Sequence, residues 1–285
     1  MTAVLLGLAA SASFACADFF GGVAARRADA WRSVLANQVV GLVPLTVYLV
    51  LLSEEAPEGR DWILSAGAGL ASVAGLGLLF GGFAVGRMAV VAPVSAGVGG
   101  LVPIIWGLLQ GERPGAVALL GAVVTLSAAV YLARSDAETS PEEVDQPDDG
   151  RASLMAVGAG LAFGIVLVTF SETDGDIGLW PPMIAHFVAV PTLLLGHLVA
   201  RRPIAPPADA RTVMLASGFF DATAVSLLLI ALQQDELVSL VAPAANLYPA
   251  GTVVLAAVVL KERLRKEQVI ALAAAAVGLV LLARG

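Results

Sequence analysis

The sequence has 285 residues, of which 58% are hydrophobic and only 14% are charged, and its mean hydropathy is +0.88. A soluble domain carries about 25% charged residues, so this composition excludes an ordinary water-soluble enzyme, a disordered chain and a nucleic-acid-binding protein. The net charge of −7 comes from a single segment, because seven acids and no Lys or Arg lie between Ser135 and Gly150. The only cysteine, Cys16, excludes an intramolecular disulfide.

Ten apolar runs follow one another along the chain, each close to the roughly 20 residues that a membrane-spanning helix needs. Their apolar residues show neither the alternation of a strand nor the single stripe of a surface helix, which is typical of helices that are apolar all round. The sequence therefore predicts an all-α membrane protein with ten transmembrane helices. The runs cover residues 2–22, 32–52, 62–85, 88–109, 115–133, 152–171, 178–199, 211–232, 237–260 and 267–283.

Short motifs recur at an offset of 150 residues in the same order. They are Val91-Ala92-Pro93 with Val241-Ala242-Pro243, Glu112-Arg113 with Glu262-Arg263, and Leu132-Ala133-Arg134 with Leu282-Ala283-Arg284. The matches predict a duplicated chain, with a first repeat at 1–134, an acidic solvated linker at 135–150 and a second repeat at 151–285.

Each half holds five runs, and an odd number reverses the orientation of the second half in the membrane. Inverted repeats are typical of secondary transporters, which bind substrate at the repeat interface near the bilayer midplane. We therefore expect two inverted five-helix repeats around a central cavity; duplication for stability alone is the alternative. Three Lys or Arg lie on the side of the termini and thirteen on the other side. The positive-inside rule then predicts a multi-pass protein of the plasma membrane with both termini outside.

Only two acids fall well inside an apolar run, Asp18 and Asp221. An acid at the centre of a membrane helix costs about 2.5–3.5 kcal/mol on insertion scales and usually faces a partner or a water-filled cavity. Asp221, near the middle of the eighth run, is the stronger functional candidate. Asp18 is either a second functional acid or an interfacial carboxylate that caps a helix or pairs with Arg26 or Arg27.

His186 aligns at offset 149 with Asn37, so the two predict either a shared central chamber or hydrogen bonds between helices. A histidine titrates near neutral pH, so His186 is a candidate for proton coupling. The two acids inside apolar runs, Asp221 and Asp18, are the other candidates. Prolines and glycines break helices, and the predicted helix-break or gating positions are Pro93, Pro243, Pro249, Gly97, Gly99 and Gly100. The remaining cavity candidates are Asn246, Tyr248, Ser95, Ser72 and Trp106, the last of which faces either the cavity or the lipid.

The ordered Ala-Pro and Glu-Arg motifs, early and late in the fourth run of each half, resemble those of the EamA-type members of the drug/metabolite transporter superfamily. The resemblance implies a basket-like ten-helix fold with a central cavity and secondary transport of small metabolites, often efflux of amino acids or drugs. Asp18 and the acidic linker are not part of a general family pattern.

The leading hypothesis is a secondary active transporter that works by alternating access, in which Asp221 binds a cationic group or exchanges a proton. An intramembrane enzyme acting on a lipid-linked substrate is the alternative, and an accessory membrane subunit is a third. The expected partners are a small-molecule substrate, the lipid bilayer and protons, with no nucleic acid, and the expected assembly is a monomer or a weak homodimer. No cofactor and no metal are expected.

Overall fold

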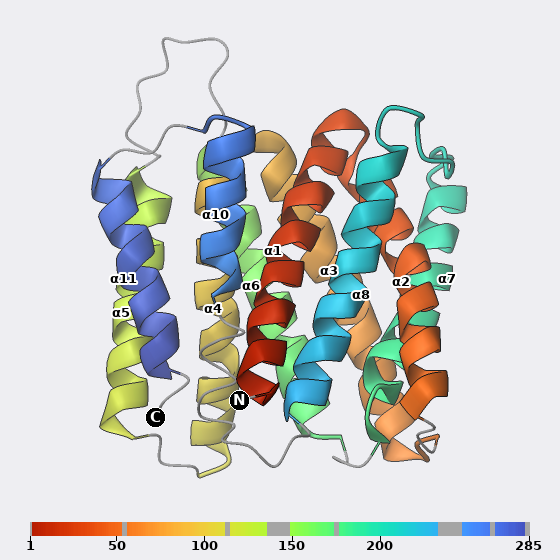
Figure 1. Cartoon of the computed structure of the whole chain (residues 1–285), viewed down its shortest axis with the longest axis horizontal. Helices are drawn as coiled ribbons and strands as arrows, with labels where there is room; N and C mark the ends of the chain where they lie inside the picture. The colour runs from red at the N-terminus through yellow and green to blue at the C-terminus, as the bar shows by residue number, and fades with distance from the viewer. Residues whose placement is uncertain are drawn as a thin grey trace.

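The computed structural model describes residues 2–52, 56–111, 115–135, 149–173, 177–232, 247–262 and 266–282. In these ranges the chain is all-α, with ten helices, as the sequence predicts (Figure 1). The helices are α1 (Thr2–Arg27), α2 (Ala30–Leu52), α3 (Arg60–Val85), α4 (Met88–Leu109), α5 (Ala116–Ser135), α6 (Asp149–Ser171), α7 (Trp180–Val199), α8 (Arg211–Leu232), α10 (Tyr248–Val259) and α11 (Lys266–Leu282).

Seven of the described helices are long and apolar enough to cross a membrane, namely α1, α2, α3, α4, α6, α7 and α8. Many large apolar side chains are also exposed on the outside of the bundle, among them Val50, Ile63 and Leu109, which are 70%, 74% and 76% exposed. Soluble monomers rarely expose apolar patches of this extent. A surface of this kind matches hydrocarbon rather than water, so the chain is a multi-pass membrane protein.

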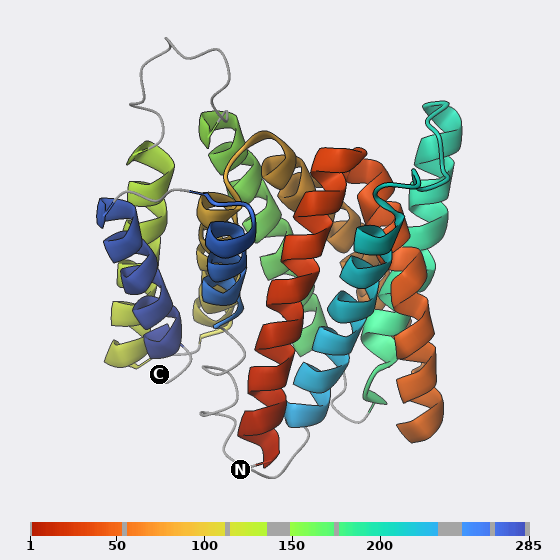
Figure 2. The same cartoon turned by 45° about the horizontal axis from the view of Figure 1, so that its top comes forward.

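Consecutive helices run in opposite directions, and α1 begins at the end of the bundle where α11 finishes (Figure 1). Helices of the first half pack mainly on helices of the second half: α1 on α8, α3 and α4 on α6, and α5 on α11. The pairs α1–α8 and α5–α11 stay side by side in both views (Figures 1 and 2). The interior of the bundle is therefore built jointly by both halves of the chain.

Small residues bring several of these helices close together. A Cβ added to Gly160 of α6 would lie 2.5 Å from the carbonyl oxygen of Ser95 on α4, and one added to Gly218 of α8 would lie 2.5 Å from the carbonyl oxygen of Asn37 on α2. Both distances are too short for any side chain, so glycine is required where these backbones meet. Such contacts are the usual way in which helices associate in lipid.

The prediction that prolines interrupt the fourth run is wrong, because α4 is one continuous helix that contains Pro93 and Pro103. Gly97 and Gly99 are buried in this helix, and Gly99 packs closely on α6; Gly100 is half-buried. Gly99 serves helix packing here, and none of the three glycines breaks the helix.

In the ninth run, the helix α10 begins at Tyr248, so Pro249 lies in its first turn. Proline is favoured there because the first N–H groups of a helix have no acceptor within the helix. The described helix of the ninth run therefore begins at Tyr248-Pro249. Pro243 and Asn246, the Glu112-Arg113 motif and residues 136–148 of the acidic linker lie outside the described residues.

Candidate functional site

A cluster of polar side chains joins three helices inside the bundle. Asn37 of α2 is 1% exposed, and its Nδ2 donates a hydrogen bond to Ser217 Oγ of α8 at 3.1 Å. Ser217 Oγ in turn donates to the carbonyl oxygen of Ala17 on α1 at 3.0 Å. Asp221 lies one helical turn after Ser217, and its carboxyl group is hydrogen-bonded by the Asn37 side chain. Asp221 therefore lies against α2, and Ser217, one turn before it, links α8 to α1.

Asp18, which is half-buried like Asp221, belongs to the same cluster. Asp18 follows Ala17 on α1, and its carboxyl group lies close enough to Asp221 and to the Tyr248 hydroxyl to interact electrostatically with both. The ring of Phe14, one turn before Asp18, packs on the ring of Tyr248 with 5.6 Å between the centroids. Asp18 thus faces α8 and α10, in the interior of the bundle.

The alternative that Asp18 pairs with Arg26 or Arg27 is wrong. Arg26 Nη2 forms an ion pair with Glu262 at 2.9 Å. Arg27 Nη1 donates to the carbonyl oxygen of Asp209 at 3.1 Å. The Arg26 guanidinium group is therefore directed toward the segment after α10, and that of Arg27 toward the segment before α8. The carboxyl group of Asp18 has no basic partner from α1.

His186 of α7 lies next to this cluster and is 7% exposed. Its Nδ1 is 2.8 Å from the carbonyl oxygen of Pro182. A carbonyl only accepts, so Nδ1 carries the hydrogen, and Nε2 of the neutral ring is an acceptor. This Nε2 has no hydrogen-bond partner among the described residues and touches Gly41, one turn after Asn37 on α2, near Ala222. His186 therefore packs on α2 one turn after Asn37, at the junction of α2, α7 and α8.

Three other predicted cavity residues have different surroundings. Ser95 of α4 is buried where α4 packs on Gly160 of α6. Ser72 is half-buried on α3. Trp106 is 39% exposed at the end of α4, where its indole N–H donates to Glu172 Oε1 at 3.0 Å. The fourth helix thus contributes its predicted residues to packing and to one end of the bundle.

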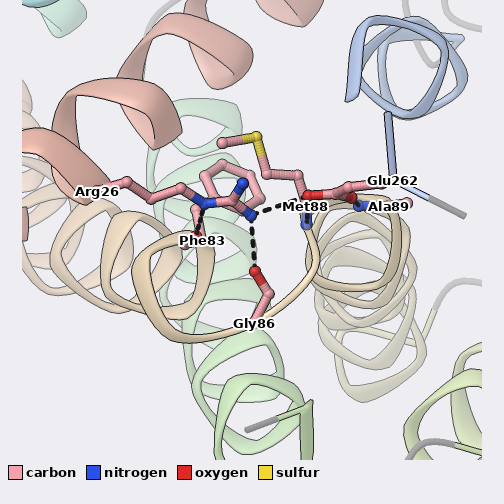
Figure 3. A network of polar contacts seen from close by, with 6 residues as sticks. All are labelled: Arg26, Phe83, Gly86, Met88, Ala89 and Glu262. Carbon is pink, nitrogen blue, oxygen red and sulfur yellow. Dashed lines mark hydrogen bonds and ion pairs between the residues drawn. The ribbon is translucent and has the colours of Figure 1, made fainter. Parts of the chain in front are cut away.

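A polar network closes the end of the bundle at which α1 finishes (Figure 3). Arg26 donates to the carbonyl oxygens of Phe83 and Gly86 at 2.7 and 2.8 Å and to Glu262 Oε1 at 2.9 Å. The Glu262 carboxylate also accepts from the backbone N–H groups of Met88 and Ala89 at 3.3 and 3.1 Å. These are the first two residues of α4, whose N–H groups have no acceptor within the helix. Glu262 therefore caps α4 from the segment between α10 and α11.

A second network lies at the other end, where α3 begins. Arg60 Nη2 pairs with Glu172 Oε2 at 3.0 Å, and Arg60 Nη1 donates to the Glu172 carbonyl oxygen at 3.1 Å. The hydrogen bonds that Trp106 and Arg60 Nη2 donate to the carboxylate, together with the Arg60 charge, lower the pKa of Glu172, because each favours the charged carboxylate. At both ends, then, an arginine of the first half holds a glutamate of the second half.

Only some of the residues in the cluster and in the two end networks could be predicted from the sequence. Ser217 was missed, although it precedes Asp221 by one helical turn and so lies on the same face. Glu262 was noticed as part of a repeated motif but not as a cap, and the Arg60–Glu172 pair was missed, because single sequences do not show which distant residues meet. In the part of the chain that the structure describes, no group of three or more His, Cys, Asp or Glu residues could hold a metal ion.

Long apolar helices with apolar exposed faces and a buried polar cluster define a multi-pass membrane protein. Comparison with protein families identifies residues 150–284 as an EamA-like transporter family domain. The family resemblance read from the motifs is therefore confirmed for this half. The family is one of transporters and not of enzymes, so the protein is a membrane transporter, and the alternative of an intramembrane enzyme has no support.

Comparison with solved structures covers the whole chain. One crystal structure shares 15% sequence identity over 98% of this chain and 94% of its own, with a TM-score of 0.67. At this identity the likeness shows the fold alone, and it extends to both halves. No curated protein matches the sequence.

Proposed function

We propose that the protein is a secondary active transporter that exports a small metabolite or an amphipathic organic compound by alternating access, with the cluster around Asp221 as its substrate site. The observation that carries this proposal is the meeting of Asp18 and Asp221 from two helices inside the bundle. Each acid costs about 2.5–3.5 kcal/mol to insert, and the two carboxyl groups lie close enough to repel each other electrostatically. A bundle with only a structural role gains nothing from such a pair.

Two inverted five-helix repeats around a central cavity fit this proposal. Because five helices precede α6 and consecutive helices alternate in direction, α6 runs opposite to α1. Ten membrane spans, with the first repeat at 1–134 and the second at 151–285, then leave both termini on one side of the plasma membrane. The excess of Lys and Arg on the opposite side supports termini outside the cytoplasm. A C-terminal green fluorescent protein fusion, which fluoresces only in the cytoplasm, should stay dark, whereas a phosphatase fusion should be active.

The two end networks are suited to act as the alternating gates. Arg26–Glu262 joins the halves at one end of the bundle, and Arg60–Glu172 joins them at the other. Alternating access requires that contacts between the two halves break at one end while they persist at the other. Hydrogen-bonded ion pairs at helix ends can exchange with water at low cost, because exposed pairs contribute only about 0–1 kcal/mol.

Proton coupling through Asp221 is tested with purified protein in liposomes that contain a pH-sensitive dye. A panel of amino acids, amines and amphipathic drugs is added outside, and the compounds that drive a proton flux in the wild type are kept. Asp221→Asn should abolish this flux with an unchanged elution profile and helical content. Asp209→Asn, an exposed acid before α8, is the matched control. Undiminished flux in Asp221→Asn would remove Asp221 from the mechanism.

A further inference from the structure

We infer that the cluster binds an organic cation with N–H donors, a primary ammonium or a guanidinium, between the carboxylates of Asp18 and Asp221. This inference rests on the proposed transport function and names the class of its substrate. It follows from three features of the described residues: the kinds of polar atoms that remain unpaired, the lack of a nearby positive charge, and the position of two aromatic rings.

The unpaired polar atoms of the site are acceptors. Asn37 uses its amide nitrogen on Ser217 and on the Asp221 carboxyl group, and its Oδ1 has no hydrogen-bond partner among the described residues. His186 uses Nδ1 on a backbone carbonyl and leaves Nε2 as a bare acceptor. Both side chains are more than nine-tenths buried. A buried acceptor without a donor costs roughly 1–3 kcal/mol, and a ligand rich in N–H groups would remove that cost.

Among the residues that the structure describes, the two carboxyl groups have no positive partner inside the bundle. Every Lys and Arg of the described ranges lies in the first or last turn of a helix or in a connecting segment. The two that come closest along α1, Arg26 and Arg27, donate to other groups. Charges that are withdrawn from water are normally paired, so a cationic ligand is the natural complement of the half-buried acids Asp18 and Asp221. A carboxylate ligand would meet like charge.

Two aromatic rings border the acids and suit the apolar part of such a ligand. Phe14 lies four residues before Asp18, on the same face of α1, and packs on Tyr248. A cation over the face of an aromatic ring gains about 0.5–2 kcal/mol. The rings therefore favour an ammonium or guanidinium attached to a hydrocarbon group over a small inorganic cation.

The test uses the full chain in detergent and five compounds with one apolar group and different heads: benzylammonium, benzylguanidinium, benzyltrimethylammonium, benzyl alcohol and benzoate. A ligand of the folded state raises the thermal midpoint by mass action. We expect saturable stabilisation by the first two compounds and at least tenfold weaker binding of benzyltrimethylammonium, which has the charge but no N–H donor. Benzyl alcohol and benzoate should give no saturable shift.

Asp221→Asn and Asp18→Asn should each weaken benzylammonium binding at least tenfold, whereas Asp209→Asn should leave it unchanged. If either site variant fails to fold, the wild-type order of the five compounds decides. Benzoate binding that depends on Asp221 would overturn the inference that the ligand is a cation. It would not affect the proposed transport function, because the proton-flux assay reports transport independently. Stabilisation by none of the amines, or stabilisation that both acid variants retain, would also overturn the inference.

Discussion

Replacing Glu262 with alanine removes a carboxylate that is shared by two helices at one end of the bundle. The N–H groups of Met88 and Ala89 lose their acceptor, and loss of a helix cap costs about 0.5–2 kcal/mol. Arg26 loses its ion pair but keeps its two carbonyl acceptors. The Arg26 side chain is 30% exposed and the Glu262 side chain 9%, so the pair is only partly screened by water and contributes about 1 kcal/mol. Together these losses destabilise the fold by about 2 kcal/mol.

A loss of this size lowers the thermal midpoint by roughly 4–8 °C for a chain of this length. The assay is alkylation of Cys16, the only cysteine, by a fluorogenic maleimide as the protein is heated in detergent. Glu267→Ala, at an exposed acid in the first turn of α11, is the matched control and should stay within about 0.5 kcal/mol of the wild type. Glu262→Gln keeps an acceptor for α4 and should lose less than half as much as alanine. Equal midpoints for Glu262→Ala and Glu267→Ala would refute the capping role.

Two further predictions follow from the described contacts. The Trp106 and Arg60 hydrogen bonds lower the pKa of Glu172 in the folded state, so the stability that they contribute is present at neutral pH and is lost as the pH falls through that lowered value. Acid titration of the tryptophan fluorescence should show a transition below pH 4.5, the ordinary value for a glutamate, that Trp106→Phe removes. A transition retained in that variant would contradict the assignment to Glu172. Gly218→Ala should destabilise the fold by about 1–3 kcal/mol, because its Cβ would meet the backbone of α2. Gly67→Ala, in open space within α3, should instead stabilise the fold by about 0.5–1 kcal/mol. A chemical-denaturation series in which both variants changed the stability in the same direction would contradict the close packing of α2 on α8.

The helices could be predicted from the sequence because the membrane leaves few choices. In hydrocarbon every backbone N–H and C=O must be satisfied within the segment, so an apolar run of sufficient length forms a helix. The runs predicted at 88–109 and 211–232 have the same bounds as α4 and α8. The expectation that proline interrupts a helix failed in α4, which is continuous through Pro93 and Pro103, because neighbouring helices can satisfy the backbone groups that a proline frees.

The contacts of the candidate site could be predicted only in part. Insertion cost alone selects Asp18 and Asp221 as unusual, since it depends on one residue and its neighbours in sequence. Which helices meet depends on packing between segments far apart in the chain. Asn37 and Ser217 are separated by 180 positions, and Arg26 and Glu262 by 236. No periodicity in a single sequence contains that information.

Helix packing and the polar cluster depend on the same few atoms. Gly218 follows Ser217 and precedes Asp221 by three residues, and the backbone of α2 lies against it at Asn37. This close approach brings the Asn37 amide within reach of Ser217 Oγ and of the Asp221 carboxyl group. A larger residue at position 218 would push α2 away from α8 and would lengthen both hydrogen bonds. A substitution at position 218 would thus alter the site without contacting a ligand, because it changes the distance between α2 and α8. A rocking motion of one half against the other would change the same distance.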